Sequence, residues 1–159
     1  CNSSSIYPTS AVPTLPTTGF TYIAWARMKS SSADWRTLFR TTPNDHPILV
    51  EIGSNRLGMY DNTVGAFFPA GYDVSGLANV WAQWVVTGDS SGQTFYINGQ
   101  QVGTVTGQTA AGNNHNWVGG IGTNSQNFGY VANTFLYAAK LTLEQIQQNY
   151  YGLKGVFGV

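Results

Sequence analysis

The sequence predicts an all-β domain made of two antiparallel sheets packed face to face, with one short helix near its C-terminal end. Three observations support this fold class. Short β-rich runs recur along most of the chain, glycine makes up 19 of the 159 residues, and Asn98-Gly99 separates two of the runs. Asn-Gly between β-rich segments is the strongest short hairpin signal, because a type I′ turn needs positive φ at both central residues. Many short strands joined by glycine-rich turns are typical of a sandwich.

The composition narrows the classes of partner. Only 9% of the residues are charged, and seven basic residues balance seven acidic ones. Without a basic excess to neutralise phosphates, we expect no binding to nucleic acid. No apolar run approaches the ~20 residues of a spanning helix, and no polybasic or amphipathic stretch is present, so we expect no membrane insertion.

A surface covered mainly by Ser, Thr, Asn, Gln, Gly and Tyr fits two settings. One is extracellular, with a neutral glycan as the partner. The other is a surface buried by identical neighbours, since a net charge of zero removes the repulsion that keeps monomers apart. An ordinary low-charge secreted domain is the third reading.

Residues 1–19 predict an extended arm, because they are rich in Ser, Thr and Pro and each proline removes a backbone donor. Cys1 is the only cysteine, so an intrachain disulfide is impossible. Cys1 followed by a serine-rich spacer is similar to a processed bacterial lipoprotein. Asn2-Ser3-Ser4 is also a glycosylation sequon, and a third reading is that a domain boundary falls here.

The strands follow in order along the chain. Residues 20–28 alternate between two faces, with Phe20, Tyr22, Ala24, Ala26 and Met28 on one of them. Further strands are expected at 37–40, 48–52, 56–60, 66–68, 81–87, 94–97, 102–106, 117–121, 128–131 and 134–140, with loops at 72–79 and 109–116.

A single helix is expected after these strands. Thr142 and Gln145 have the spacing of a capping box, in which the threonine hydroxyl accepts from the glutamine amide. Leu143, Ile146 and Tyr150 then share one helical face. Gly152 is expected to end the helix, which leaves residues 153–159 as an apolar tail.

A set of short motifs over residues 20–152 resembles the laminin-G-like branch of the concanavalin A-like lectin/glucanase jelly rolls. The matching residues, in chain order, are Phe20, Thr21, Ala24, Trp25 and Arg27; Trp35, Thr37, Leu38 and Phe39; Trp81, Val85, Val86 and Thr87; Tyr96 to Gln100, Val102 and Gly103; Ile121 and Gly122; and Tyr137, Leu141, Thr142, Glu144, Ile146 and Tyr150. The resemblance implies a jelly-roll sandwich. It leaves the function open, because this fold hosts enzymes, lectins, adhesion modules and structural domains.

Glycoside hydrolysis needs two carboxyl groups roughly 5 to 9.5 Å apart. None of the seven acidic residues has another at i+2 or i+4, and Glu51 is the only one expected inside a strand. A pair assembled from loops, such as Asp45 with Asp61, stays an alternative. His46 and His115 are expected as solvated loop residues without a nucleophile motif beside them. We therefore predict no catalytic residues and no enzyme activity.

The chain has no compact Asp/Asn ligand motif, so we predict no metal and no cofactor. A glycan site needs an aromatic platform and nearby amides. Asn114, His115, Trp117 and Asn127 offer these residue types within a short stretch and are the predicted carbohydrate-binding residues. The alternative is that Trp117 begins a core strand and the asparagines only make turns.

These observations predict a non-catalytic binding or adhesion domain, extracellular or at the cell surface, whose partner is a glycan or another cell-surface or matrix component. The alternative is a structural subunit of an extracellular filament or surface layer. Such a subunit would self-assemble by adding its terminal segments, residues 1–19 or 153–159, to a neighbour's sheet edge.

Overall fold

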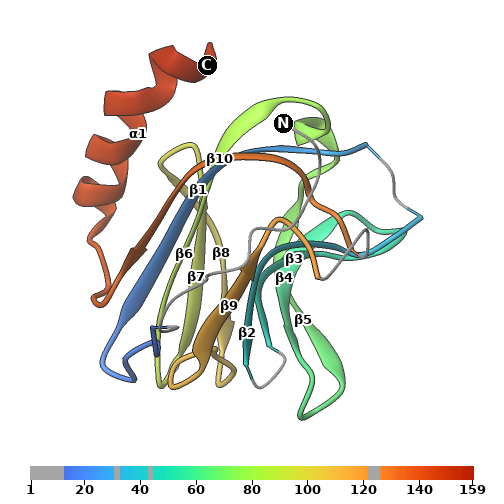
Figure 1. Ribbon diagram of the computed structural model, residues 1–159, viewed down its shortest axis with the longest axis vertical. Helices are drawn as coiled ribbons and strands as arrows, with labels where there is room; N and C mark the ends of the chain where they lie inside the picture. Colours follow the sequence, from blue (N-terminus) through green and yellow to red (C-terminus); the bar gives the residue numbers. More distant parts are fainter. Residues whose placement is uncertain (1–12, 31–32, 43–44, 122–125) are drawn as a thin grey trace.

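The computed structural model describes residues 13–30, 33–42, 45–121 and 126–159. The described residues form two five-stranded antiparallel sheets, so the predicted sandwich is confirmed (Figure 1). The first sheet has the order β10-β1-β6-β7-β8, and the second has the order β5-β4-β3-β2-β9. The predictions about Cys1 and Asn2 lie outside the described residues.

The strands are β1 (Phe20–Met28), β2 (Arg36–Thr42), β3 (His46–Val50), β4 (Arg56–Asp61), β5 (Ala66–Asp73), β6 (Trp81–Asp89), β7 (Gly92–Ile97), β8 (Gln100–Thr106), β9 (Asn114–Val118) and β10 (Gly129–Tyr137). A 3-10 turn covers Ser75–Leu77, and helix α1 covers Leu143–Phe157. Two turns in the first sheet are as tight as predicted. Asp89 pairs with Gly92, and Ile97 pairs with Gln100 across Asn98 and Gly99, whose φ angles are 50° and 74°.

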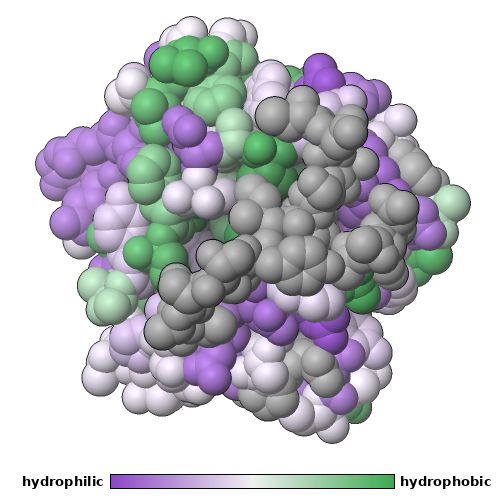
Figure 2. All heavy atoms as spheres, viewed as in Figure 1, coloured by the Kyte–Doolittle hydropathy of each residue, from purple (hydrophilic) through white to green (hydrophobic). Residues whose placement is uncertain are grey.

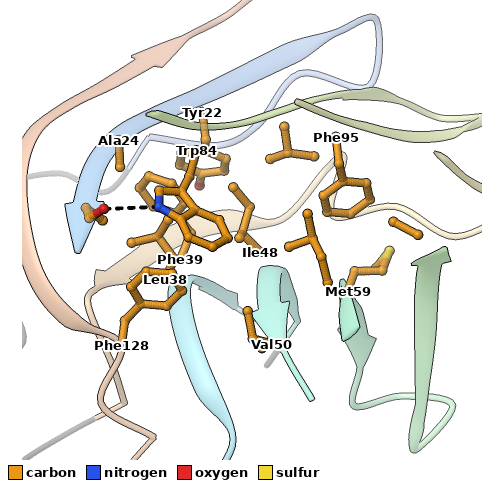
Figure 3. Packing of buried hydrophobic residues seen from close by; sticks show 14 of the residues in the cluster. Tyr22, Ala24, Leu38, Phe39, Ile48, Val50, Met59, Trp84, Phe95 and Phe128 are labelled. Atoms are coloured by element: carbon orange, nitrogen blue, oxygen red, sulfur yellow. Dashed lines mark hydrogen bonds between the residues drawn. The ribbon is translucent and has the colours of Figure 1, made fainter. Parts of the chain in front are cut away.

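The core lies between the two sheets. The residues that were predicted to share one face of β1, from Phe20 to Met28 at every second position, are buried in it. Figure 3 shows Trp84 of the first sheet packed among side chains from the second, with its Nε1 donating to the carbonyl of Ala26 at 3.1 Å. The Trp84 ring meets Phe128 edge to face at 5.0 Å. An indole can be buried here because its polar atom has a partner.

Helix α1 lies outside the first sheet and begins as predicted (Figure 1). Thr142 and Gln145 form the complete capping box, and Ile146 is buried against Ile23, Val85 and Tyr96. The prediction that Gly152 ends the helix is wrong, because α1 continues to Phe157 and ends at Gly158 in a left-handed conformation. The Phe157 ring stacks on Trp25 at 4.4 Å, and this burial outweighs the ~1 kcal/mol that a helical glycine costs.

Strand β10 differs from the prediction of two separate strands at 128–131 and 134–140. It is one strand that pairs with β1 on both sides of a register shift. Thr134 pairs with Ala24 and Ala132 with Trp25, so Asn133, with a φ of 34°, is the extra residue of a bulge. The bulge interrupts the alternation of side chains, which explains why the pattern looked like two strands.

Two predicted loops are partly strand. The expected short strand at 66–68 extends to Asp73, so the predicted loop at 72–79 begins later and contains the 3-10 turn. Strand β9 begins at Asn114 rather than at Trp117 and ends at Val118. It is an edge strand, and residues 13–15 lie along it. Thr14 bridges Asn114, and the Leu15 amide donates to the Asn113 carbonyl at 2.8 Å.

Candidate functional site

A pocket of about 180 Å³ opens on the outer face of the second sheet. Its lining residues are Trp35, His46, Leu49, Tyr60, Asn62 and Gln126. Ile48 and Val50 point into the core, so Leu49 between them points to the opposite face and forms the apolar floor. The pocket is therefore built on the solvent side of β3 and β4, and its wall comes from segments far apart in sequence.

Aromatic rings make one wall of the pocket. Trp35 meets Tyr60 at a centroid distance of 5.7 Å and Phe67 of β5 at 5.5 Å, both in edge-to-face geometry. The Arg56 guanidinium lies 5.8 Å from the Phe67 ring centre. These contacts hold Trp35 in place without burying both of its faces in the core.

His46 supplies the polar wall and is oriented by Thr37. The Thr37 hydroxyl lies 3.0 Å from His46 Nδ1 and donates to Gln126 Oε1 at 2.7 Å. Because this hydroxyl has one proton, it accepts from Nδ1, and the neutral ring then carries its free lone pair on Nε2. Burial lowers the pKa of His46 to about 4, and the nearby Arg40 charge acts in the same direction. The ring is thus neutral at physiological pH.

The prediction that His46 and His115 are solvated loop residues is wrong. His46 is the first residue of β3 and is only 4% exposed. His115 is the second residue of β9 and is half-buried, with its Nδ1 3.0 Å from the Tyr22 hydroxyl. Burial lowers the pKa of His115 as well. Both rings occupy strands whose packing shields them, and sequence neighbours do not reveal such packing.

Trp117 extends the outer face beyond the pocket. It pairs with Arg40 across β9 and β2, and the Arg40 guanidinium lies 5.1 Å from its ring centre. The next residue, Val118, is in the core, so Trp117 points outward. Phe39, the residue before Arg40, is also in the core, so Arg40 and Trp117 both lie on the outer face of the sheet, the face on which the pocket opens.

The other three predicted carbohydrate-binding residues do not join Trp117 in one pocket. A register shift at Asn116 turns His115 inward, toward Tyr22. The Asn114 carboxamide oxygen accepts from the Thr14 hydroxyl at 2.5 Å. The Asn127 carboxamide oxygen accepts from the Gly129 amide at 2.9 Å, which fits the alternative that the asparagines make turns.

The sequence prediction missed the pocket residues Trp35, His46, Tyr60, Asn62 and Gln126 as a binding set. Trp35 was assigned only to a fold motif. One signal could have pointed to Tyr60 and Asn62, which alternate with the buried Leu57 and Met59 of β4. His46 has the same parity as the core residues Ile48 and Val50 and reaches the pocket only because the register is irregular between His46 and Leu49. Gln126 carries no such signal, because only the tertiary fold brings it beside Thr37.

Two carboxyl groups meet behind the pocket. Asp45 and Asp61 are 5% and 8% exposed, and they flank the cross-strand pair His46 and Tyr60, so their carboxyl groups face each other and interact. Burial raises the pKa of Asp45 to about 6, and the Asp61 charge adds to this rise. Hydrogen bonds from Thr63 and Val64 hold the pKa of Asp61 below its usual range, against the effect of its own burial.

The geometry of this pair differs from that of a glycosidase, whose two carboxyls stand roughly 5 to 9.5 Å apart on either side of the scissile bond. Glu51, expected inside a strand, lies just after β3 in the turn to β4, where Arg56 Nε donates to its carboxylate at 2.7 Å. Within residues 13–30, 33–42, 45–121 and 126–159, no group of three or more His, Cys, Asp and Glu side chains is placed to hold a metal ion.

Comparison with known proteins gives one family match. A family model described as the concanavalin A-like lectin/glucanases superfamily matches residues 2–147. A search of curated protein sequences gives no match.

Solved structures share the fold at low sequence identity. A Bacteroides ovatus protein, described as a candidate carbohydrate-binding protein, has a TM-score of 0.65 at 16% identity, over 91% of this chain and 43% of its own. Botulinum neurotoxin type C, with cell entry described as dependent on interaction with two ganglioside molecules, has a TM-score of 0.60 at 19% identity, over 86% of this chain and 36% of its own. Trypanosoma rangeli sialidase in complex with sialic acid has a TM-score of 0.62 at 14% identity, over 87% of this chain and 23% of its own. The chain thus spans less than half the length of each of these structures.

Proposed function

Since the chain belongs to the concanavalin A-like lectin/glucanase superfamily, we propose that it is a carbohydrate-binding domain whose site is the pocket on the outer face of the second sheet. The observation that carries the proposal is the composition of that pocket. Two aromatic rings, a neutral imidazole and two carboxamides face one small cavity above an apolar floor.

This set of groups matches the chemistry of a sugar ring. The apolar C–H face of a pyranose packs on an aromatic ring, here Trp35 or Tyr60. Its hydroxyls donate to an acceptor such as His46 Nε2 and exchange hydrogen bonds with the carboxamides of Asn62 and Gln126. None of the described residues that line the pocket carries a carboxylate, and a neutral sugar needs none.

The structural neighbours support a carbohydrate as the ligand. The Bacteroides ovatus protein is described as carbohydrate-binding, and other neighbours are described with gangliosides or sialic acid. We propose that the domain is non-catalytic, because Asp45 and Asp61 interact with each other rather than standing on either side of a cleavable bond. We propose that it is extracellular or at the cell surface, because a surface of low charge suits a glycan partner. No helix in the described parts of the chain is long and apolar enough to span a membrane.

A glycan array with the wild type, Trp35→Ala and Trp117→Ala tests the site. We expect the wild type to bind a subset of neutral glycans, and Trp35→Ala to weaken that binding by about tenfold or more, which is ~1.4 kcal/mol. Tyr151→Ala is the matched control, because Tyr151 is an aromatic residue that is 60% exposed on helix α1.

Each other outcome of the array has a distinct meaning. If Trp117→Ala abolishes binding and Trp35→Ala does not, the site is the one predicted around Asn114, His115, Trp117 and Asn127. An array with nothing above background, with and without calcium, refutes carbohydrate binding. Release of reducing sugar from β-glucans would show an enzyme instead.

The alternative function, a filament subunit, depends on terminal segments that act on a neighbour. Of these segments, residues 13–15 lie on β9 of their own domain, and the C-terminal residues to Phe157 form a helix on their own first sheet. Residues 1–12 lie outside the described residues. No described contact therefore favours self-assembly over binding.

A further inference from the structure

The buried carboxyl pair and the pocket are built from the same short segments. Asp45 precedes His46, and Asp61 lies between Tyr60 and Asn62, so three pocket residues are direct chain neighbours of the pair. The pair also connects the two segments. The Asn62 amide donates to Asp45 Oδ1 at 3.3 Å, while Asp61 accepts from the amides of Thr63 and Val64 at 2.7 and 3.2 Å.

We propose that the Asp45–Asp61 pair is a proton-operated latch on the pocket. With one shared proton, it holds the 61–65 turn against the start of β3 and keeps His46, Tyr60 and Asn62 in their binding arrangement. When the proton leaves, the turn is released and glycan binding weakens. This regulation rests on the proposed carbohydrate function of the same pocket.

Among the described residues, no cation acts on the pKa of either carboxyl of the pair, and Arg40 of β2 acts on His46 instead. The three ion pairs among the described residues are Lys29–Asp34, Arg56–Glu51 and Lys140–Asp89. From β2, Thr41 donates its amide to the Asp45 carbonyl at 2.8 Å, and from the 110–113 turn the Asn113 carboxamide donates to the Asp45 carboxyl. Both groups are neutral. His46, the titratable neighbour on β3, is neutral above pH 4 because its pKa is lowered to about 4.

Two like charges in contact and shielded from water cannot both be stable, so one carboxyl keeps its proton well above its ordinary pKa. The raised pKa of Asp45, about 6, and the lowered pKa of Asp61 place this proton on Asp45. The latch is therefore closed below about pH 6 and opens as the pH rises through that value.

The first test uses the free protein with EDTA and needs no ligand. In ¹H–¹⁵N NMR spectra recorded from about pH 4.5 to 8, the backbone amides of Asn62, Thr63 and Val64 should shift together with a midpoint near the Asp45 pKa of about 6. Asp45→Asn should abolish this transition, since the carboxamide donates to Asp61 at every pH. The control is Asp73→Asn, because the Asp73 carboxylate accepts from the Ser75 amide and is not among the residues that line the pocket.

The second test measures binding of the best array glycan on either side of the transition. Wild-type affinity should fall by about tenfold from the acidic to the alkaline side, whereas Asp45→Asn should keep the acidic-side affinity throughout. Amides that do not titrate, or that shift only when calcium is added, overturn the latch. Binding that is independent of pH in the wild type overturns it too. An array without any binding refutes the proposed function, while the NMR titration still reports on the latch.

Discussion

His46 shows how a single ring can be set by its neighbours. The Thr37 hydroxyl oxygen accepts from His46 Nδ1, and its proton goes to Gln126 Oε1. The charge of Arg40 disfavours a second proton on the ring. The result is a neutral acceptor at the pocket rather than a cation. A hydroxyl donor on the ligand can pair with Nε2, whereas a bare carbonyl cannot.

The first prediction concerns the pH dependence of stability. The folded-state pKa of His46 is lowered from 6.5 to about 4, so the unfolded chain binds the proton first. The stability due to neutral His46 is complete above pH 6.5 and is lost as the pH falls through about 4. His46→Asn, which keeps a partner for Thr37, should remove this loss of roughly 3 kcal/mol.

Urea unfolding of the two proteins across this pH range measures the effect. Asp45 acts in the opposite direction, because its pKa is raised in the folded state. Its contribution to the free energy of unfolding is complete below pH 3.8 and is lost as the pH rises through about 6. The His46→Asn variant should therefore become more stable on mild acidification. Parallel curves for the wild type and the variant would mean that His46 is not buried as a neutral ring.

At the scale of elements, helix α1 has a capping box at its start and two glycines in its C-terminal half. Figure 2 shows polar surface over its first turns and hydrophobic surface at its C-terminal end, where Val156 is 75% exposed. Gly152 and Gly155 lower the helix propensity of the last turns. The Phe157 ring nevertheless packs against the rings of Trp25 and Trp81, with centroid distances of 4.4 and 5.2 Å. Tertiary contacts at the far end therefore keep the helix intact.

The second prediction follows from those glycines. A Cβ atom at Gly152 or Gly155 would meet nothing within 4 Å, so alanine fits both positions. Each Gly→Ala change should raise the free energy of unfolding by about 0.5–1 kcal/mol, because alanine loses less backbone entropy in a helix. Thermal and urea denaturation measure this gain.

Gly158→Ala is the control for the helix, since its φ of 70° favours glycine at the C-cap and alanine should be destabilising there. If Gly152→Ala instead lowered stability, the chain would leave the helix near Gly152, as the sequence pattern suggested.

At the scale of the whole molecule, the two sheets approach closely at β5 and β8. A Cβ atom on Gly103 of β8 would lie 1.9 Å from the Ala70 carbonyl oxygen of β5. On the other side, residues 13–15 pair with edge strand β9 of the second sheet.

The third prediction tests this close approach. Gly103→Ala should destabilise the domain by about 1–3 kcal/mol or more, because the clash is with backbone and cannot be relieved by a rotamer change. Gly76→Ala, where a Cβ atom meets nothing within 4 Å, should change stability by less than about 0.5 kcal/mol. Equal melting temperatures for the two variants would show that β5 and β8 are not in contact.

Local patterns were sufficient for most of the fold. The alternation in residues 20–28, the Asn98-Gly99 turn and the Thr142 capping box each depend on residues within a few positions of one another, and each is confirmed. Adjacent strands joined by tight turns give a meander directly. The sequence by itself therefore determined the fold class, the place of most strands along the chain and the start of the helix.

The tertiary structure alone decided the candidate site. The hydrogen bond between Thr37 and Gln126 joins residues 89 positions apart, and the contact of Asp45 with Asp61 depends on the β3–β4 register. The burial of His46, the bulge at Asn133 and the helix beyond Gly152 were also missed. Each is set by the packing of distant segments, because solvent exclusion and non-local contacts outweigh local preferences of about 1 kcal/mol.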